Sequence, residues 1–208
     1  MTAARSPDSM RQFMQRLDYE SGIRLTPRSS LLHALSPTLT GQVIHLVPGT
    51  YIVPTGLSLT ANDTVLIGYG AIFRRGNRGA GTILRITADR AKVFGITFDD
   101  DLGSGDAVRL INSRYVELHD IYVPAGPGGG VTVGNGVYLE ASDNCLLHNV
   151  VVGADATRPD PPLGGEIWLD DNSDDCRIHG CDADGGVISY LGLSGTVDGV
   201  NIPVATAR

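Results

Sequence analysis

Four segments of the chain repeat the same order of apolar and polar positions. Each begins with a short run of the form apolar–x–apolar, continues through a polar turn, and ends with a second run whose apolar residues recur two or three positions apart. Alternation over such short runs predicts β-strands that bury one face. The first runs of the last three segments contain Leu110, Leu139 and Leu169, which follow one another at 29 and 30 residues. The segments run from Ile83 to Phe98, Val108 to Val123, Val137 to Val152 and Ile167 to Ala183.

The second runs of these segments align residue by residue, and the length changes are confined to loops rich in glycine, proline and aspartate. One such repeat cannot bury its apolar face alone, whereas repeats stacked at the ~4.8 Å spacing of paired strands bury a continuous core. The pattern therefore predicts an all-β parallel solenoid, with the cysteines as small buried apolar residues. The aligned rows are Val116/Cys145/Cys176, Leu118/Leu147/Ile178 and Ile121/Val150/Cys181.

The N-terminal segment has a different pattern. Residues 6–22 predict one amphipathic helix, with Ser6 as the N-cap, Pro7 in the first turn and Gly22 at its end. We expect two regions, a helical arm or cap over residues 1–40 and a parallel β-helix domain over 41–208. The helix either covers the end of the solenoid or docks onto a partner. Its apolar stripe consists of Met10, Phe13, Met14 and Leu17.

Two further runs carry a resemblance to a known family. The runs Val43–Tyr51 and Thr64–Ala71 resemble the opening coil of right-handed β-helix proteins of the pectate-lyase superfamily. The resemblance covers about residues 41 to 202 and implies a right-handed single-stranded parallel β-helix of about six coils. That fold hosts lyases, hydrolases, epimerases, adhesins and bacteriophage head and tail proteins, so the fold alone does not choose among activities.

Composition and charge limit the classes of binding partner that the chain is expected to have. The 208 residues include 27 glycines, as expected for short strands joined by tight turns, and carry a formal net charge of −7. An acidic balance argues against nucleic acid as the main partner, because phosphate binding needs a basic surface. No apolar run approaches the ~20 residues of a membrane helix. The first residues lack the apolar stretch of a secretory signal.

Catalytic candidates come from the acidic turns. Enzymes of the resembled superfamily act on acidic polysaccharides, with paired carboxylates or with Ca²⁺ beside a basic residue. The best matches are Asp99, Asp101 and Asp106, with Arg109 as the base. The full motif sets of those enzymes are absent, and Ile178-His179-Gly180 matches one element only. We therefore expect no catalytic site and no cofactor, and solvated turn residues are the favoured interpretation, with a Ca²⁺ site or a catalytic pair as the alternatives.

Two outward columns stand out. One contains three histidines, His119, His148 and His179, with Phe94 one coil earlier, and a surface ladder is favoured over a metal site because metals need convergent ligands. The other mixes arginine with aromatic residues, which are enriched at interfaces and also stack on sugars. We expect it to be a subunit interface, a glycan platform or isolated exposed residues. Its members are Arg85, Arg109, Tyr138 and Trp168.

Three functions follow as hypotheses. The first is a non-catalytic structural or adhesive module of a bacteriophage virion, such as a head decoration, fibre or tail protein. It would act as a homo-oligomer, expected to be a trimer, and dock on other virion proteins through its N-terminal arm. The virion location rests on the family resemblance. The second is a polysaccharide lyase or glycoside hydrolase acting on acidic glycans. The third is a glycan-binding module that uses Tyr138 and Trp168.

Overall fold

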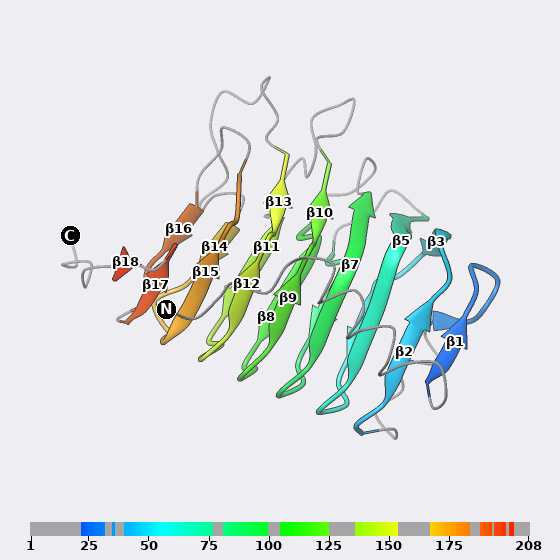
Figure 1. Cartoon of the computed structure of the whole chain (residues 1–208), viewed down its shortest axis with the longest axis horizontal. Coiled ribbons are helices and arrows are strands. Elements are labelled where there is room, and N and C mark those ends of the chain that lie inside the picture. Colours follow the sequence, from blue (N-terminus) through cyan, green and yellow to red (C-terminus); the bar gives the residue numbers. More distant parts are fainter. Residues whose placement is uncertain are drawn as a thin grey trace, which may run out of the picture.

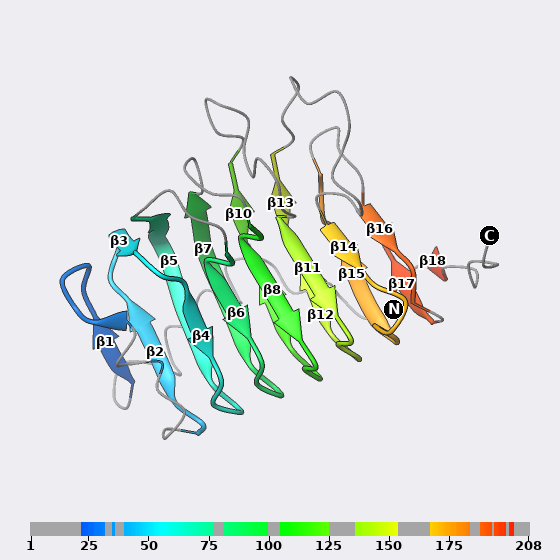
Figure 2. The ribbon, with the colours of Figure 1, turned by 180° about the vertical axis from the view of Figure 1, so that it is seen from behind.

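The computed structural model describes residues 22–31, 35, 40–76, 81–99, 105–124, 136–153, 167–183, 188–192, 194–198 and 200–201. These residues form two sheets whose strands alternate along the chain. Figure 1 shows the larger sheet in front. Figure 2 shows the molecule from the opposite side, with the smaller sheet in front. The larger sheet holds β1 (Ile23–Leu25), β2 (Val43–Leu46), β3 (Gly49–Val53), β5 (Val65–Arg75), β7 (Lys92–Asp99), β9 (Glu117–His119), β10 (Tyr122–Val123), β12 (Leu146–His148), β13 (Val151–Val152), β15 (Cys176–His179), β17 (Gly195–Val197) and β18 (Val200–Asn201). The smaller sheet holds β4 (Leu57–Leu59), β6 (Leu84–Ile86), β8 (Val108–Ile111), β11 (Val137–Glu140), β14 (Ile167–Leu169) and β16 (Ile188–Tyr190).

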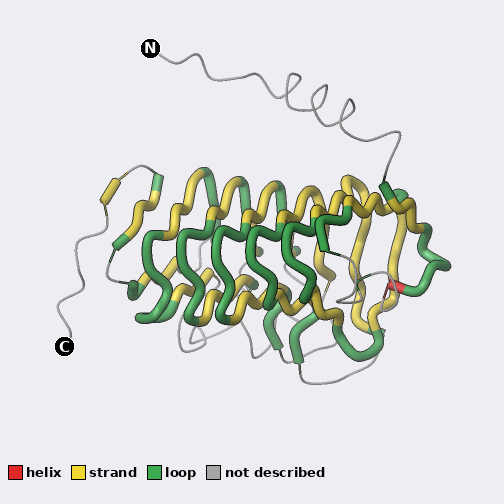
Figure 3. The backbone as a smooth tube through the Cα atoms, turned by 90° about the horizontal axis from the view of Figure 1, so that it is seen from below, coloured by secondary structure: helices red, strands yellow, loops and turns green. Residues whose placement is uncertain are grey.

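The predicted parallel solenoid is confirmed. Strands of successive repeats pair in parallel, with Leu110 opposite Leu139 and Leu139 opposite Leu169. Figure 3 shows the turns lying side by side along one axis. Four turns follow the sequence repeat, built from β6–β7, β8–β10, β11–β13 and β14–β15, which is fewer than the about six coils predicted for this chain. The right-handed sense of the winding stays a prediction.

The core consists of the aligned apolar rows. Val116 and Leu118 are fully buried, as are the equivalent residues of the next turns. A stack of three larger rings, Tyr51, Phe73 and Phe98, fills the end near β3 with edge-to-face contacts at 5.9 and 5.6 Å between centroids. Burying these rows excludes water from the axis, which supplies the main driving force for stacking the turns.

The cysteines take the places that the alignment predicts. Cys145 and Cys176 are buried in the core, and Cys181 is partly buried. The neighbouring Cys145 and the burial itself both raise the pKa of the Cys176 thiol. Burial likewise raises the pKa of Cys181. Because the thiolate is the reactive form, these residues serve as packing groups.

Repeated backbone geometry shapes the corners between the sheets. Arg90, Tyr115, Asn144 and Asp175 occupy one corner of four successive turns with φ between 55° and 58°. Inside the same corner, buried serines link the turns: the Ser113 amide donates to Ser142 Oγ at 3.2 Å, and the Ser142 amide donates to Ser173 Oγ at 3.0 Å. The polar turns of the sequence repeat are therefore hydrogen-bonded columns rather than irregular loops.

Residues 1–21, which hold nearly all of the predicted helix and its stripe of Met10, Phe13, Met14 and Leu17, lie outside the described residues. Part of the segment assigned to the arm belongs to the larger sheet instead, because β1 pairs with β2 in parallel, Ile23 opposite Ile44. Apolar Ile23 and Leu25 extend the inward rows by one strand, which is why this short run joins the sheet. Over the described residues, no helix has the length and apolar character needed to cross a membrane.

Candidate functional site

The predicted outward column of arginine and aromatic residues exists. Strand pairing places Arg85 opposite Arg109, Arg109 opposite Tyr138 and Tyr138 opposite Trp168. The Tyr138 and Trp168 rings stack with centroids 4.6 Å apart and planes 7° apart, and the Arg109 guanidinium lies 4.7 Å from the Tyr138 centroid. We call Arg109, Tyr138 and Trp168 the aromatic column. It lies on the outer face of the smaller sheet, the side seen in Figure 2.

Stacking covers both faces of the central ring. Arg109 lies over one face of Tyr138 and Trp168 over the other. The indole Nε1 of Trp168 is buried and has no hydrogen-bond partner among the described residues. Within that part of the chain, stacking on Tyr138 is the contact that orients the ring. A sugar needs an open aromatic face, and Tyr138 offers only its edge. At Tyr138 the column therefore presents the edge of the ring, not its face, to the surroundings.

Carboxylates neutralise the cation of the column. Arg109 donates from Nη2 and Nε to Glu140 Oε2 at 2.7 and 3.1 Å, and its Nη1 lies 3.5 Å from Asp106 Oδ2. Burial raises the pKa of Tyr138, and the charges of Asp170 and Glu140 raise it further. The tyrosine is therefore a neutral, half-buried group, and Arg109 is engaged in ion pairs on the protein itself.

The structure does not bring the predicted catalytic residues together at one site. Asp106 contacts Arg109, but Asp99 lies at the end of β7, where it pairs with Arg74 at 2.6 Å. Asp101 lies outside the described residues. The ion pair with Arg74 joins neighbouring strands of the larger sheet, so Asp99 serves a structural contact there.

Asp170, which follows β14 in another acidic turn, stabilises that turn. Asp170 accepts hydrogen bonds from the amides of Ala141 and Asn172 and from Ser173 Oγ. Over the part of the chain that the structure describes, no three histidine, cysteine or acidic side chains are placed to hold a metal ion. A Ca²⁺ site stays a prediction.

The three predicted histidines form a stack on the outer face of the larger sheet. The centroids of His119 and His148 are 5.4 Å apart, those of His148 and His179 are 5.3 Å apart, and Phe94 stacks on His119 at 4.9 Å. We call His119, His148 and His179 the histidine ladder. Burial lowers the pKa of His148, and the neighbouring His119 lowers it further.

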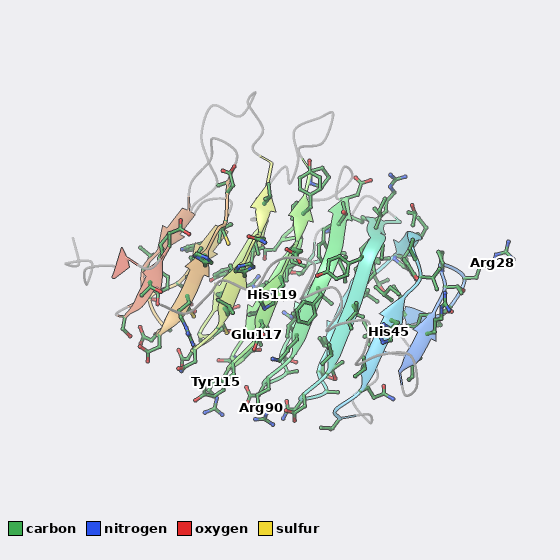
Figure 4. The ribbon with its side chains drawn as sticks, in the orientation of Figure 1. Arg28, His45, Arg90, Tyr115, Glu117 and His119 are labelled. Carbon is green, nitrogen blue, oxygen red and sulfur yellow. The ribbon has the colours of Figure 1, made fainter. Side chains whose placement is uncertain are left out.

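Sequence reasoning missed the charged residues beside the ladder. Glu117 lies between Lys92 Nζ at 2.7 Å and His119 Nε2 at 3.2 Å. Figure 4 labels Glu117 and His119 on this face. At the other end, Asp198 lies 3.5 Å from His179 Nδ1. The alignment did hold a signal, because Lys92 and Glu117 both precede an aligned core residue and so fall opposite each other.

A polar contact between two distant turns was also missed. The Tyr69 hydroxyl donates to Asp120 Oδ2 at 2.7 Å, and Asn149 Nδ2 donates to Asp120 Oδ1 at 3.0 Å. Asp120, Asn149 and Gly180 occupy equivalent corner positions with φ between 52° and 60°. The recurrence of Asp, Asn and Gly, the residues that tolerate this backbone region, was the available signal.

No family model matches the chain, and no curated protein matches it. Among solved structures, the chain is similar to one named "putative glycosyl hydrolase" from Parabacteroides merdae ATCC 43184, with 12% sequence identity and a TM-score of 0.47. The match covers 78% of this chain and 84% of that one. A likeness of this degree carries no argument about what this chain does.

Proposed function

We propose that this chain is a non-catalytic structural or adhesive module that assembles as a homo-oligomer through its aromatic column. The observation that carries the proposal is the sandwich of Arg109, Tyr138 and Trp168 on an outer sheet face. Arginine, tyrosine and tryptophan dominate the binding energy of protein interfaces. Their stacking also fixes the rings before any partner arrives, which lowers the entropy lost on binding.

Charge pairing on the same face supports this proposal. A buried contact surface needs its charges neutralised, and Arg109 is already paired with Glu140 and Asp106. The same pairing disfavours catalysis by these groups. An arginine already paired with two carboxylates of the chain must break those ion pairs before it can act on an acidic substrate.

The finer form of the proposal is a trimeric bacteriophage virion component, such as a head decoration, fibre or tail protein, with residues 1–40 docking on neighbouring virion proteins. Its support is the resemblance of the coils to right-handed β-helix proteins, some of which have such roles. The competing hypothesis is a polysaccharide lyase or hydrolase that would use Asp106 and Arg109.

The mass of the full chain in solution tests the proposal. We expect native mass spectrometry and light scattering across a wide concentration series to show a closed oligomer. Replacing Trp168 by alanine should weaken assembly by about 30-fold, as for an interface hot spot worth about 2 kcal/mol. The matched control is Tyr122→Ala, which removes a 47% exposed ring on β10 of the other sheet and should leave assembly unchanged.

Two results would overturn the proposal. One is a monomer at every concentration. The other is an oligomer whose stability Trp168→Ala does not change, which would place the interface elsewhere. A monomer that cleaves an acidic polysaccharide, and loses that activity in Arg109→Gln, would establish the competing enzyme hypothesis.

A further inference from the structure

The histidine ladder joins three successive turns near the C-terminal end of the solenoid. His119 lies on β9, His148 on β12 and His179 on β15, and strand pairing places each directly opposite the next. The ring centroids are 5.4 and 5.3 Å apart, with tilts of 43° and 39°. Neutral imidazoles tolerate this spacing. Imidazolium rings at the same spacing repel, because like charges in a stack have no counter-charge between them.

Carboxylates contact the two end rings of the ladder. Glu117 contacts His119 at 3.2 Å and also binds Lys92 on β7. Asp198, which follows β17, lies 3.5 Å from His179. A proton on either end ring therefore has an opposite charge beside it.

The middle ring has a different setting. His148 stacks between the other two histidines, and the carboxylate that acts on it is Asp120 at the corner, which already binds Tyr69 and Asn149. On the neighbouring strand β15, the charged side chain two positions before His179 is Arg177, which adds positive charge to the face. Charging the end rings therefore makes a third charge at His148 unfavourable.

We propose that the histidine ladder makes the last turns of the solenoid acid-sensitive: neutral rings hold β12 and β15 together, and protonation between about pH 7 and pH 5 separates them. The separation occurs at this end because, among the described strands, β15 is followed in the sheet by the short β17, whose residues are half-buried. Opening exposes the edge of β12, and an exposed strand edge is a template for pairing with another chain. The inference does not depend on the aromatic column.

The direction of the titration agrees with this geometry. Burial and the two neighbouring histidines lower the pKa of His148 in the folded protein. The unfolded chain therefore takes up this proton more readily than the folded one. The contribution of a neutral His148 to stability is complete above the ordinary value of about 6.5 and is lost as the pH falls below it.

Amide hydrogen exchange of the full chain at pH 7.5, 6.5 and 5.5 tests the proposal, with rates corrected for the intrinsic pH dependence of exchange. We expect the opening equilibrium of β15 and β17 to rise severalfold from pH 7.5 to 5.5, because the opened chain takes up a proton that the stacked ladder disfavours. Strands β5 and β7 should show no such rise. The rise should disappear in His148→Phe, because phenylalanine continues the stack that Phe94 begins and takes up no proton.

Two further variants keep the test decisive. His148→Gln removes the titrating ring if the phenylalanine variant fails to fold, and His45→Gln, in the same row on β2, should keep the full acid response. Unchanged protection of β15 and β17 at pH 5.5 would overturn the proposal. So would an acid response that persists in the His148 variants, or an NMR titration placing the pKa of His148 at or above its ordinary value.

Discussion

The Tyr69 hydroxyl reaches Asp120 at 2.7 Å across an intervening turn of the solenoid. Tyr69 lies on β5, Asp120 follows β9, and Gly95 of β7 lies between them. A Cβ built on Gly95 would fall well inside van der Waals contact with three adjacent carbons of the Tyr69 ring, Cγ, Cδ1 and Cε1. Because the built Cβ is about equally close to all three carbons, the Tyr69 ring lies with its face over this glycine. The absent side chain is what lets one tyrosine connect two turns whose strands, β5 and β9, do not pair with each other.

Replacing Gly95 with alanine should therefore destabilise the protein by about 2–4 kcal/mol, from the left-handed backbone and the clash together. Gly41→Ala is the matched control, since Gly41 has φ of 75° against 70° at Gly95 and open space around its missing Cβ. It should cost only the backbone part, about 1–2 kcal/mol. Urea unfolding measures both, and adding Tyr69→Ala should remove the difference. Equal losses in the two glycine variants would contradict the face-on packing.

The aromatic column gives a second prediction. Tyr138→Ala should shift the emission of Trp168, the sole tryptophan of the chain, to longer wavelength, because the indole loses the ring that covers one face. The free energy of unfolding should fall by about 2 kcal/mol, from lost apolar burial and the stacked pair. The exposed Tyr122 provides the control, and Tyr122→Ala should leave the emission unchanged. Fluorescence spectra recorded at the lowest usable protein concentration separate this effect from assembly.

The buried serine hydroxyls at the corner between the sheets give a third prediction. Ser142 Oγ accepts the Ser113 amide and donates to the Glu140 carbonyl at 3.0 Å. Ser142→Ala leaves that buried amide without its acceptor and should destabilise the protein by about 1–3 kcal/mol. Ser58, on the exposed face of β4, is the comparison, and its alanine variant should change stability by less than about 0.5 kcal/mol. Thermal or urea unfolding measures the free energy of unfolding of both variants. Equal losses in the two would show that the serine column is not structural.

Glu117 gives a pH prediction of the same sign as that of His148, but in a more acidic range. Burial alone would raise the pKa of Glu117, but hydrogen bonds from Lys92 and His119 outweigh it and lower the pKa. Its contribution to stability is therefore present above the ordinary value of 4.5 and is lost as the pH falls through the lowered pKa. Glu117→Gln should flatten the fall in stability below about pH 4.5, as measured by urea unfolding at a series of pH values. An unchanged acid limb in this variant would refute the assignment.

Much of the fold was predictable because its rule is local. Two-residue alternation and a repeat of about thirty residues were enough to place Leu110, Leu139 and Leu169 in one inward row, and the structure pairs them so. Outward columns follow from the same register, so the aromatic column and the histidine ladder could also be named from the sequence.

Contacts that depend on side-chain length could not be predicted in this way. The register puts Tyr69, Gly95 and Asp120 in neighbouring turns, but only the missing side chain at Gly95 allows the longer contact. Likewise, the sequence placed Asp99 and Arg109 among catalytic candidates because acidic turns resemble sites. Their ion pairs with Arg74 and Glu140 depend on how far each arginine extends, which no alternation pattern records.

Trp168 is the most direct probe of the central claim, that the aromatic column is the surface through which the chain assembles. Acrylamide quenching of its fluorescence should be measured on the full chain over a dilution series spanning assembly and dissociation. We expect the quenching constant to rise on dilution in step with the fall in mass, because dissociation uncovers the indole. A quenching constant that stays flat while the mass falls would contradict the account.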